Sequence, residues 1–131
     1  MSGPQNTMRT PLGRVRHHGA SGEGTGHFIA SRWTGIALAV LAPWFVVNAA
    51  LSIGPSYASV IDFLTDPVNA VGVILLVAVS FYHMALGMQE VIVDYILKPF
   101  TKITLMLLNG FGLTVLAAGA IFAVLLVNFG A

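Results

Sequence analysis

The most informative stretch for predicting the fold of this protein runs from Val68 to Tyr95 and reads VNAVGVILLVAVSFYHMALGMQEVIVDY. It contains no Asp, Glu, Lys or Arg as far as Gln89, and a helix needs about 20 apolar residues to cross a bilayer. Lipid offers no hydrogen-bond partners to the backbone, so such a segment crosses as a helix and not as an isolated strand. The segment therefore predicts a transmembrane helix that continues past Gln89 to about Tyr95.

Two further stretches without charged residues extend from Trp33 to Ile61 and from Ile103 to Ala131. Only 8% of the residues are charged, whereas a soluble domain carries about a quarter. We therefore predict an all-α membrane protein whose three transmembrane helices lie at about 33–53, 68–95 and 103–127.

The basic residues all flank one side of these predicted helices. They are Arg9, Arg14, Arg16 and Arg32 before the first helix, and Lys98 and Lys102 between the second and the third. The first loop, about 54–67, carries Asp62 and Asp66 and no base. The positive-inside rule predicts a cytoplasmic N-terminus and a periplasmic C-terminus.

Residues 1–30 are rich in Gly, Pro and Ser, and we expect a flexible cytoplasmic arm before an anchor domain at 31–131. The arm contains His17, His18 and His27, which we interpret as surface histidines and not as a metal site, because the glycines around them preorganise nothing. The same glycines and prolines disfavour an amphipathic transit peptide, which favours a bacterial inner membrane over a mitochondrial one. The chain has no cysteine, which excludes disulfides, iron–sulfur ligands and thiolate zinc sites.

The residues that could carry chemistry lie on the second predicted helix. At 100° per residue, His83, Gly87, Glu90 and Asp94 share one face, and Tyr95 is offset from it by about 120°. His83 could form a hydrogen bond with a neighbouring helix or belong to a proton or substrate path. It could also bind haem iron, with Gly87 making room for the porphyrin. The geometry leaves all three open.

The sequence resembles the small membrane-anchor subunit of bacterial succinate dehydrogenase, respiratory complex II. The matching motifs are His83 with Gly87, Asp94-Tyr95 followed by Lys98-Pro99, and, near the N-terminus, Thr10–Arg16, Gly24–Phe28 and Arg32-Trp33-Thr34. Three helices with the N-terminus inside agree with that family.

The resemblance implies a set of roles. His83 would be one axial ligand of haem b, and a second anchor subunit, packed in the same helical bundle, would supply the other. Tyr95 would donate a hydrogen bond to a carbonyl oxygen of ubiquinone, and Asp94 would orient that network and deliver protons. Arg32, or alternatively His27, would pair with a haem propionate. The competing interpretation is that the Arg32 side chain extends its charged end to the lipid headgroups.

The expected function is that of a membrane anchor of succinate:ubiquinone oxidoreductase, linking the citric acid cycle to the respiratory chain. Its expected partners are the flavoprotein subunit, the iron–sulfur subunit, the second anchor and lipid, with no nucleic acid. The chain itself would not oxidise succinate. Alternatives are a fumarate reductase anchor, a cofactor-free helix bundle, and a small proton-coupled transporter that uses Glu90 and His83. Glu90 would deliver protons to the quinone or pair with a base of a partner chain.

Overall fold

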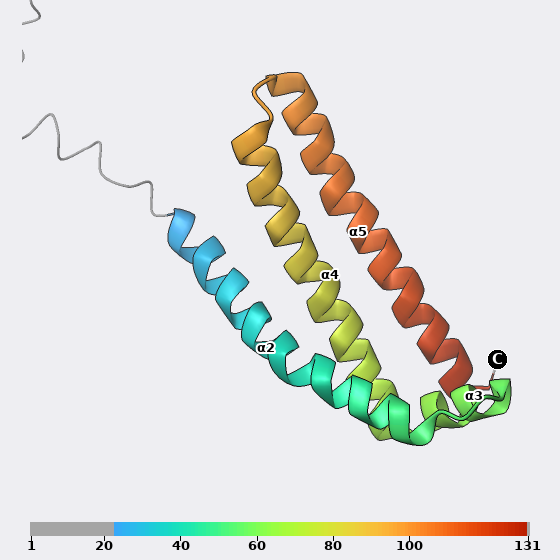
Figure 1. Ribbon diagram of the computed structural model, residues 1–131. Coiled ribbons are helices and arrows are strands. Elements are labelled where there is room, and N and C mark those ends of the chain that lie inside the picture. Colours follow the sequence, from blue (N-terminus) through green and yellow to red (C-terminus); the bar gives the residue numbers. More distant parts are fainter. Residues whose placement is uncertain (1–22, 131) are drawn as a thin grey trace, which may run out of the picture.

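The computed structural model describes residues 23–130, all of whose regular structure is helical. The elements are α2 (Glu23–Ser52), α3 (Tyr57–Thr65), α4 (Pro67–Tyr95) and α5 (Pro99–Asn128). Figure 1 shows α2, α4 and α5 as long helices and α3 as a short one beside the C-terminal end of α5. The predicted all-α class is confirmed.

Three of the described helices are long and apolar enough to cross a membrane. They span Gly24–Ser52, Pro67–Tyr95 and Pro99–Asn128, with mean hydropathies of 1.8, 2.0 and 2.4. Large apolar side chains cover their outer surfaces; Leu51 is 82% exposed and Phe111 is 72% exposed. A surface of this kind requires lipid or neighbouring subunits as its solvent, so the predicted transmembrane architecture is confirmed.

Some predictions made from the sequence concern residues outside the described range. Among them are most of the arm, its matching Thr10–Arg16 motif, and the side chains Arg9, Arg14, Arg16, His17 and His18. The part of the arm that the structure does describe, 23–30, is helical, because α2 begins at Glu23 and not near Trp33. Hydropathy marks the lipid-facing part of a helix, but its backbone hydrogen bonds continue into the interface.

The loop between α4 and α5 is shorter than the sequence indicates. We predicted that the third helix starts at about residue 103, but α4 ends at Tyr95 and Pro99 is already the first residue of α5. Proline is well suited to a first helical position, where its missing N–H has no intrahelical partner to lose. Lys102 then donates from Nζ to the Val93 carbonyl at 2.8 Å, which satisfies a group in the last turn of α4.

The short helix α3 lies in the segment predicted as a loop. Ser56 caps it by accepting a hydrogen bond from the Ser59 N–H at 3.3 Å. Phe63 is 4% exposed and meets the Phe45 ring edge-on at a centroid distance of 6.3 Å. Asn128, at the end of α5, donates to the Leu64 carbonyl at 3.2 Å. Helices α2 and α5 thus both contact α3.

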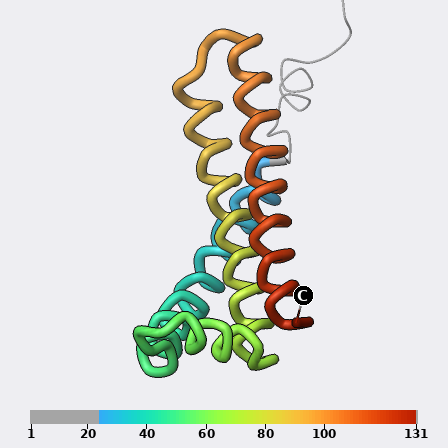
Figure 2. Tube along the Cα trace, turned by 90° about the vertical axis from the view of Figure 1, so that its right-hand side faces the viewer, coloured from blue at the N-terminus to red at the C-terminus, as the bar shows by residue number. Residues whose placement is uncertain are grey.

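Helices α4 and α5 run antiparallel and side by side in both Figure 1 and Figure 2, whereas α2 approaches α4 from the other side. The Trp44 ring of α2 rests on Gly72 of α4, at a place where an added Cβ would overlap the indole. Glycine at position 72 therefore lets the indole of α2 pack directly against the backbone of α4.

Candidate functional site

The imidazole ring of His83 contacts α2 along one edge, through Nδ1 and Cε1. Its Nδ1 lies 2.8 Å from the Thr34 hydroxyl oxygen, and its Cε1 would lie 3.6 Å from a Cβ added at Gly35. The imidazole therefore packs against α2 beside Gly35, where no side chain projects. The other nitrogen, Nε2, forms no hydrogen bond with any residue between 23 and 130.

The predicted common face of α4 is turned toward α2. Two turns beyond His83, the Glu90 carboxylate lies 3.4 Å from His27 Nδ1. Glu90 and Asp94 then line a cavity of about 310 Å³ together with His27 and Gly24 of α2. His83, Glu90 and Asp94 thus all face the same neighbouring helix.

His27 has an unusual environment. It lies in α2, and not on a flexible arm, because the helix begins at Glu23. Its side chain is only 26% exposed, and its Nε2 is buried without a hydrogen-bond partner among the described residues. A buried polar atom without a partner costs free energy, so this nitrogen is a position where a ligand or a partner chain can supply the missing group.

Asp94 and Tyr95 do not share a cavity within this chain. Tyr95 is 79% exposed and lines a groove of about 520 Å³ between α4 and α5, whereas Asp94 lines the cavity beside α2. Consecutive residues of a helix point about 100° apart, so the two side chains leave α4 on different sides. The groove under Tyr95 is lined mainly by apolar residues, including Met88, Leu108 and Leu116.

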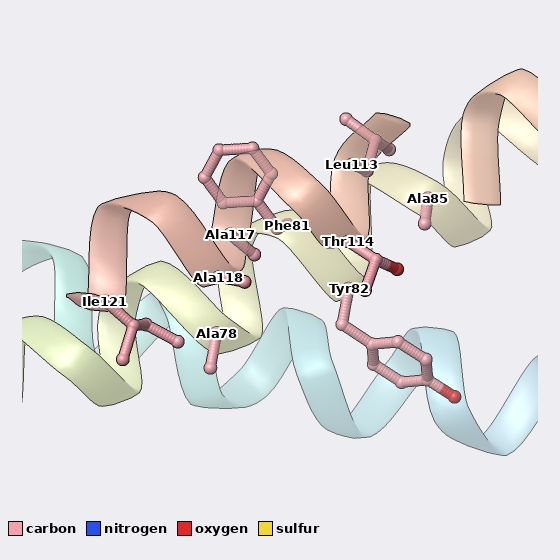
Figure 3. Close-up of a pocket in the computed structure, with 9 residues that line it drawn as sticks. All are labelled: Ala78, Phe81, Tyr82, Ala85, Leu113, Thr114, Ala117, Ala118 and Ile121. Carbon is pink, nitrogen blue, oxygen red and sulfur yellow. The ribbon is translucent and has the colours of Figure 1, made fainter. Parts of the chain in front are cut away.

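A third cavity, of about 340 Å³, lies between α4 and α5 nearer the middle of the helices. Figure 3 shows its lining, which combines small and aromatic residues. The residues are Ala78, Phe81, Tyr82, Ala85, Leu113, Thr114, Ala117, Ala118 and Ile121. It holds no carboxylate and no histidine, so it offers space but no acid, base or metal ligand.

Two further candidate residues, Arg32 and Gly87, lie toward the end of the bundle that carries His27 and Glu90. Arg32 is exposed, with its guanidinium carbon 4.7 Å from the centre of the Phe28 ring. A Cβ added at Gly87 would meet nothing within 4 Å, so the surface one turn from His83 is open.

The residues present fit a haem. An axial histidine needs one nitrogen held by the protein and the other free, and it needs a flat space beside it for the porphyrin. His83 and Gly87 supply both. Among residues 23–130 no group of three or more His, Cys, Asp or Glu side chains could hold a metal ion, so His83 is the only one of these candidate ligands at its position in the described part of the chain.

The sequence did not identify Thr34 as part of this site. The sequence feature that could have indicated it is the pair Thr34-Gly35, a polar residue followed by a small one within an apolar helix. It also did not predict the pairing of Glu90 with His27, because the two lie far apart in the sequence.

Comparison with known proteins gives a consistent result. Residues 6–127 match the model of the family described as succinate dehydrogenase/fumarate reductase transmembrane subunit. The succinate dehydrogenase hydrophobic membrane anchor subunit of Paracoccus denitrificans is 31% identical over 122 residues, covering 93% of this chain and 94% of that protein.

The subunits of the same name from two Rickettsia species match over shorter stretches. The Rickettsia felis subunit is 34% identical over 77 residues, which cover 59% of this chain and 64% of that protein. The Rickettsia bellii subunit is 30% identical over 89 residues, covering 68% of this chain and 71% of that protein. No solved structure matches the chain significantly. With its three apolar helices and a match along nearly its whole length, this chain belongs to the family of succinate dehydrogenase membrane-anchor subunits.

Proposed function

We propose that this chain anchors a succinate:ubiquinone oxidoreductase in the bacterial inner membrane, binds haem b together with a second anchor subunit, and forms part of the site where ubiquinone is reduced. Membership of the family supports the anchoring role. The observation that carries the haem assignment is the position of His83, whose Nδ1 is engaged by Thr34 while Nε2 has no partner in the described chain.

Haem b, when bound, supplies one-electron transfer. His83 would bind the iron through Nε2, and the bare helix surface at Gly87 would leave space for the porphyrin. His27 and Arg32 are the groups available to donate to a propionate. His27 is supported by its buried, unpartnered Nε2, and Arg32 by its exposed guanidinium close to the same end of α2.

Tyr95 would donate its hydroxyl hydrogen to a carbonyl oxygen of ubiquinone. A donor at that oxygen stabilises the negative charge that arrives with the electrons. The exposure of Tyr95 and the apolar groove beneath it support this role, since a quinone brings a polar head and an apolar tail. Asp94 would act from the adjacent side of α4, about 100° around the helix, where it shares a cavity with Glu90 and His27 that could lead protons toward the head group.

The catalytic subunits would dock at the end of the bundle that carries Arg32, Lys98 and Lys102. The positive-inside rule supports a cytoplasmic location for this end, because the acidic residues Asp62, within α3, and Asp66, at the start of α4, lie at the opposite end of α4. The flavoprotein and iron–sulfur subunits are the proposed partners there. The names of the relatives favour succinate oxidation over fumarate reduction as the physiological direction.

A proton transporter built on Glu90 gains no support. Its carboxylate is 58% exposed and pairs with His27 in the last turns of α4, whereas a transport carboxylate is expected to face a protected path.

The test is a reduced-minus-oxidised optical spectrum of the purified complex. The wild type and His27→Gln should show a low-spin b-type haem, and His83→Ala should lose it or convert it to a high-spin form. A complex that assembles without haem, or a His83→Ala complex with an unchanged low-spin spectrum, would remove haem binding from the proposed function.

A further inference from the structure

The hydroxyl of Thr34 contacts three polar atoms. Its Oγ1 lies 2.8 Å from the Ala30 carbonyl oxygen, 3.1 Å from the Ser31 carbonyl oxygen and 2.8 Å from His83 Nδ1. A hydroxyl has one hydrogen to donate, and it can accept at its two lone pairs. A carbonyl oxygen can only accept.

This arrangement determines which partner donates. If the hydroxyl hydrogen pointed at His83, two oxygens with negative partial charge, those of Thr34 and Ala30, would face each other at 2.8 Å with no hydrogen between them. If it points toward the helix backbone and is shared between the Ala30 and Ser31 carbonyls, every contact is satisfied provided that Nδ1 carries a proton and donates it to Oγ1. The second arrangement is the favourable one, because helical Thr commonly donates to the carbonyl four residues back.

The tautomer of the ring then follows. A neutral imidazole has one N–H and one bare nitrogen, so a proton on Nδ1 leaves the lone pair on Nε2. The one hydrogen bond that His83 makes with another described residue is at Nδ1, so this lone pair has no such partner there. We propose that Thr34 is a positioning residue that holds His83 in the Nδ1–H tautomer and thereby prepares Nε2 to bind iron.

The inference rests on the proposed haem function and adds a residue and a mechanism to it. Metal-binding histidines are generally oriented by a hydrogen bond from their second nitrogen, which also raises the basicity of the ligand. Here the acceptor is a hydroxyl on a different helix, so the packing of α2 on α4 controls the ligand. Gly35, the next residue along α2, lies beside the same ring, since a Cβ added there would be 3.6 Å from Cε1 of His83, an ordinary van der Waals contact.

The variants that test this are Thr34→Val, which replaces the hydroxyl with a methyl group of similar size, and Thr34→Ser, which keeps it. Thr114→Val is the matched control, because the Thr114 hydroxyl bonds only the Gly110 carbonyl of its own helix, at 2.7 Å. The readouts on the purified complex are the haem content per complex, the electron paramagnetic resonance spectrum of the oxidised haem and its midpoint potential.

We expect Thr34→Val to lower haem content about tenfold, the lower end of the effect found for such supporting partners. The haem that remains should have a raised midpoint potential, because a less basic imidazole stabilises ferric iron less well. Thr34→Ser should restore both values and Thr114→Val should leave them unchanged. A Thr34→Val complex with wild-type haem content and potential would overturn the inference while leaving the haem function intact. A wild-type complex without haem would overturn both.

A measurement on the wild type decides the matter if the Thr34 variants do not assemble. The full chain, labelled with ¹⁵N-histidine in lipid bicelles, gives the tautomer of His83 from its two ring nitrogen signals, which His83→Gln identifies among the four histidines. A proton on Nδ1 supports the proposal, and a proton on Nε2 refutes it.

Discussion

Replacing Gly72 with alanine should separate α2 from α4 and destabilise the bundle. An alanine Cβ would lie 3.0 Å from Cζ2 of Trp44 and would overlap two further atoms of the ring. Carbon atoms pack best at about 3.5–4.0 Å, so the indole, and α2 with it, must move by about an ångström or more.

The expected cost is set by this overlap. Adding a methyl group to a packed contact typically costs about 1–3 kcal/mol. At about 1.4 kcal/mol per factor of ten, this shifts the unfolding equilibrium roughly 5- to 150-fold. An exposed helical glycine behaves in the opposite way, since alanine stabilises a helix interior by about 1 kcal/mol relative to glycine. Gly119 is such a position, because nothing lies within 4 Å of an added Cβ, and Gly119→Ala is the matched control.

The assay is unfolding of the chain by sodium dodecyl sulfate in mixed micelles, followed by tryptophan fluorescence. The chain has two tryptophans, and a Trp33→Phe background leaves Trp44, the residue that the new methyl group would displace, as the only reporter. Gly72→Ala should unfold at a lower detergent fraction than the parent, with a changed native emission, whereas Gly119→Ala should be neutral or stabilised. Equal midpoints and equal emission for the two variants would refute the packing described for α2 and α4.

Three other changes probe the site and the bundle. Tyr95→Phe should slow ubiquinone reduction about 100-fold, the usual loss for one donor to a developing anion, and leave succinate oxidation by an artificial dye unchanged; equal loss of both activities would count against a role at the quinone. Gly87→Val should lower the haem-to-protein ratio measured by pyridine haemochrome while leaving the unfolding midpoint of the chain near that of the wild type, because the space beside Gly87 is open within the chain; unchanged haem content would mean that the porphyrin lies elsewhere. Asn109→Leu removes the 2.9 Å hydrogen bond from α5 to the Ala85 carbonyl of α4 and should cost about 0.6 kcal/mol in the same detergent titration, so a loss above about 2 kcal/mol would contradict the view that such bonds are weak in membranes.

Much of the fold could be read from the sequence because lipid imposes strict conditions. A long run without charges must be helical, so the three spans followed from the absence of Asp, Glu, Lys and Arg. The end of the second helix at Tyr95 was also predicted correctly. The starts of α2 at Glu23 and of α5 at Pro99 were not, because those turns lie outside the apolar runs that hydropathy detects.

The short helix α3 was missed for a different reason. Its stability comes from the Ser56 cap and from the burial of Phe63 against Phe45, and only the first of these is local in the sequence. A helix this short is marginal without such tertiary contacts, so the segment was interpreted as a loop.

For the site, the sequence alone was enough to predict which residues share a face of α4. Helical periodicity alone puts His83, Glu90 and Asp94 in line and turns Tyr95 away from them. The contacts of that face are visible only in the tertiary structure. There Thr34 contacts Nδ1 of His83, and His27 contacts Glu90. Periodicity describes a helix about its own axis, whereas the neighbour of each side chain depends on how two helices are aligned. Here the Trp44 ring fits over Gly72, a contact between residues that no local pattern connects.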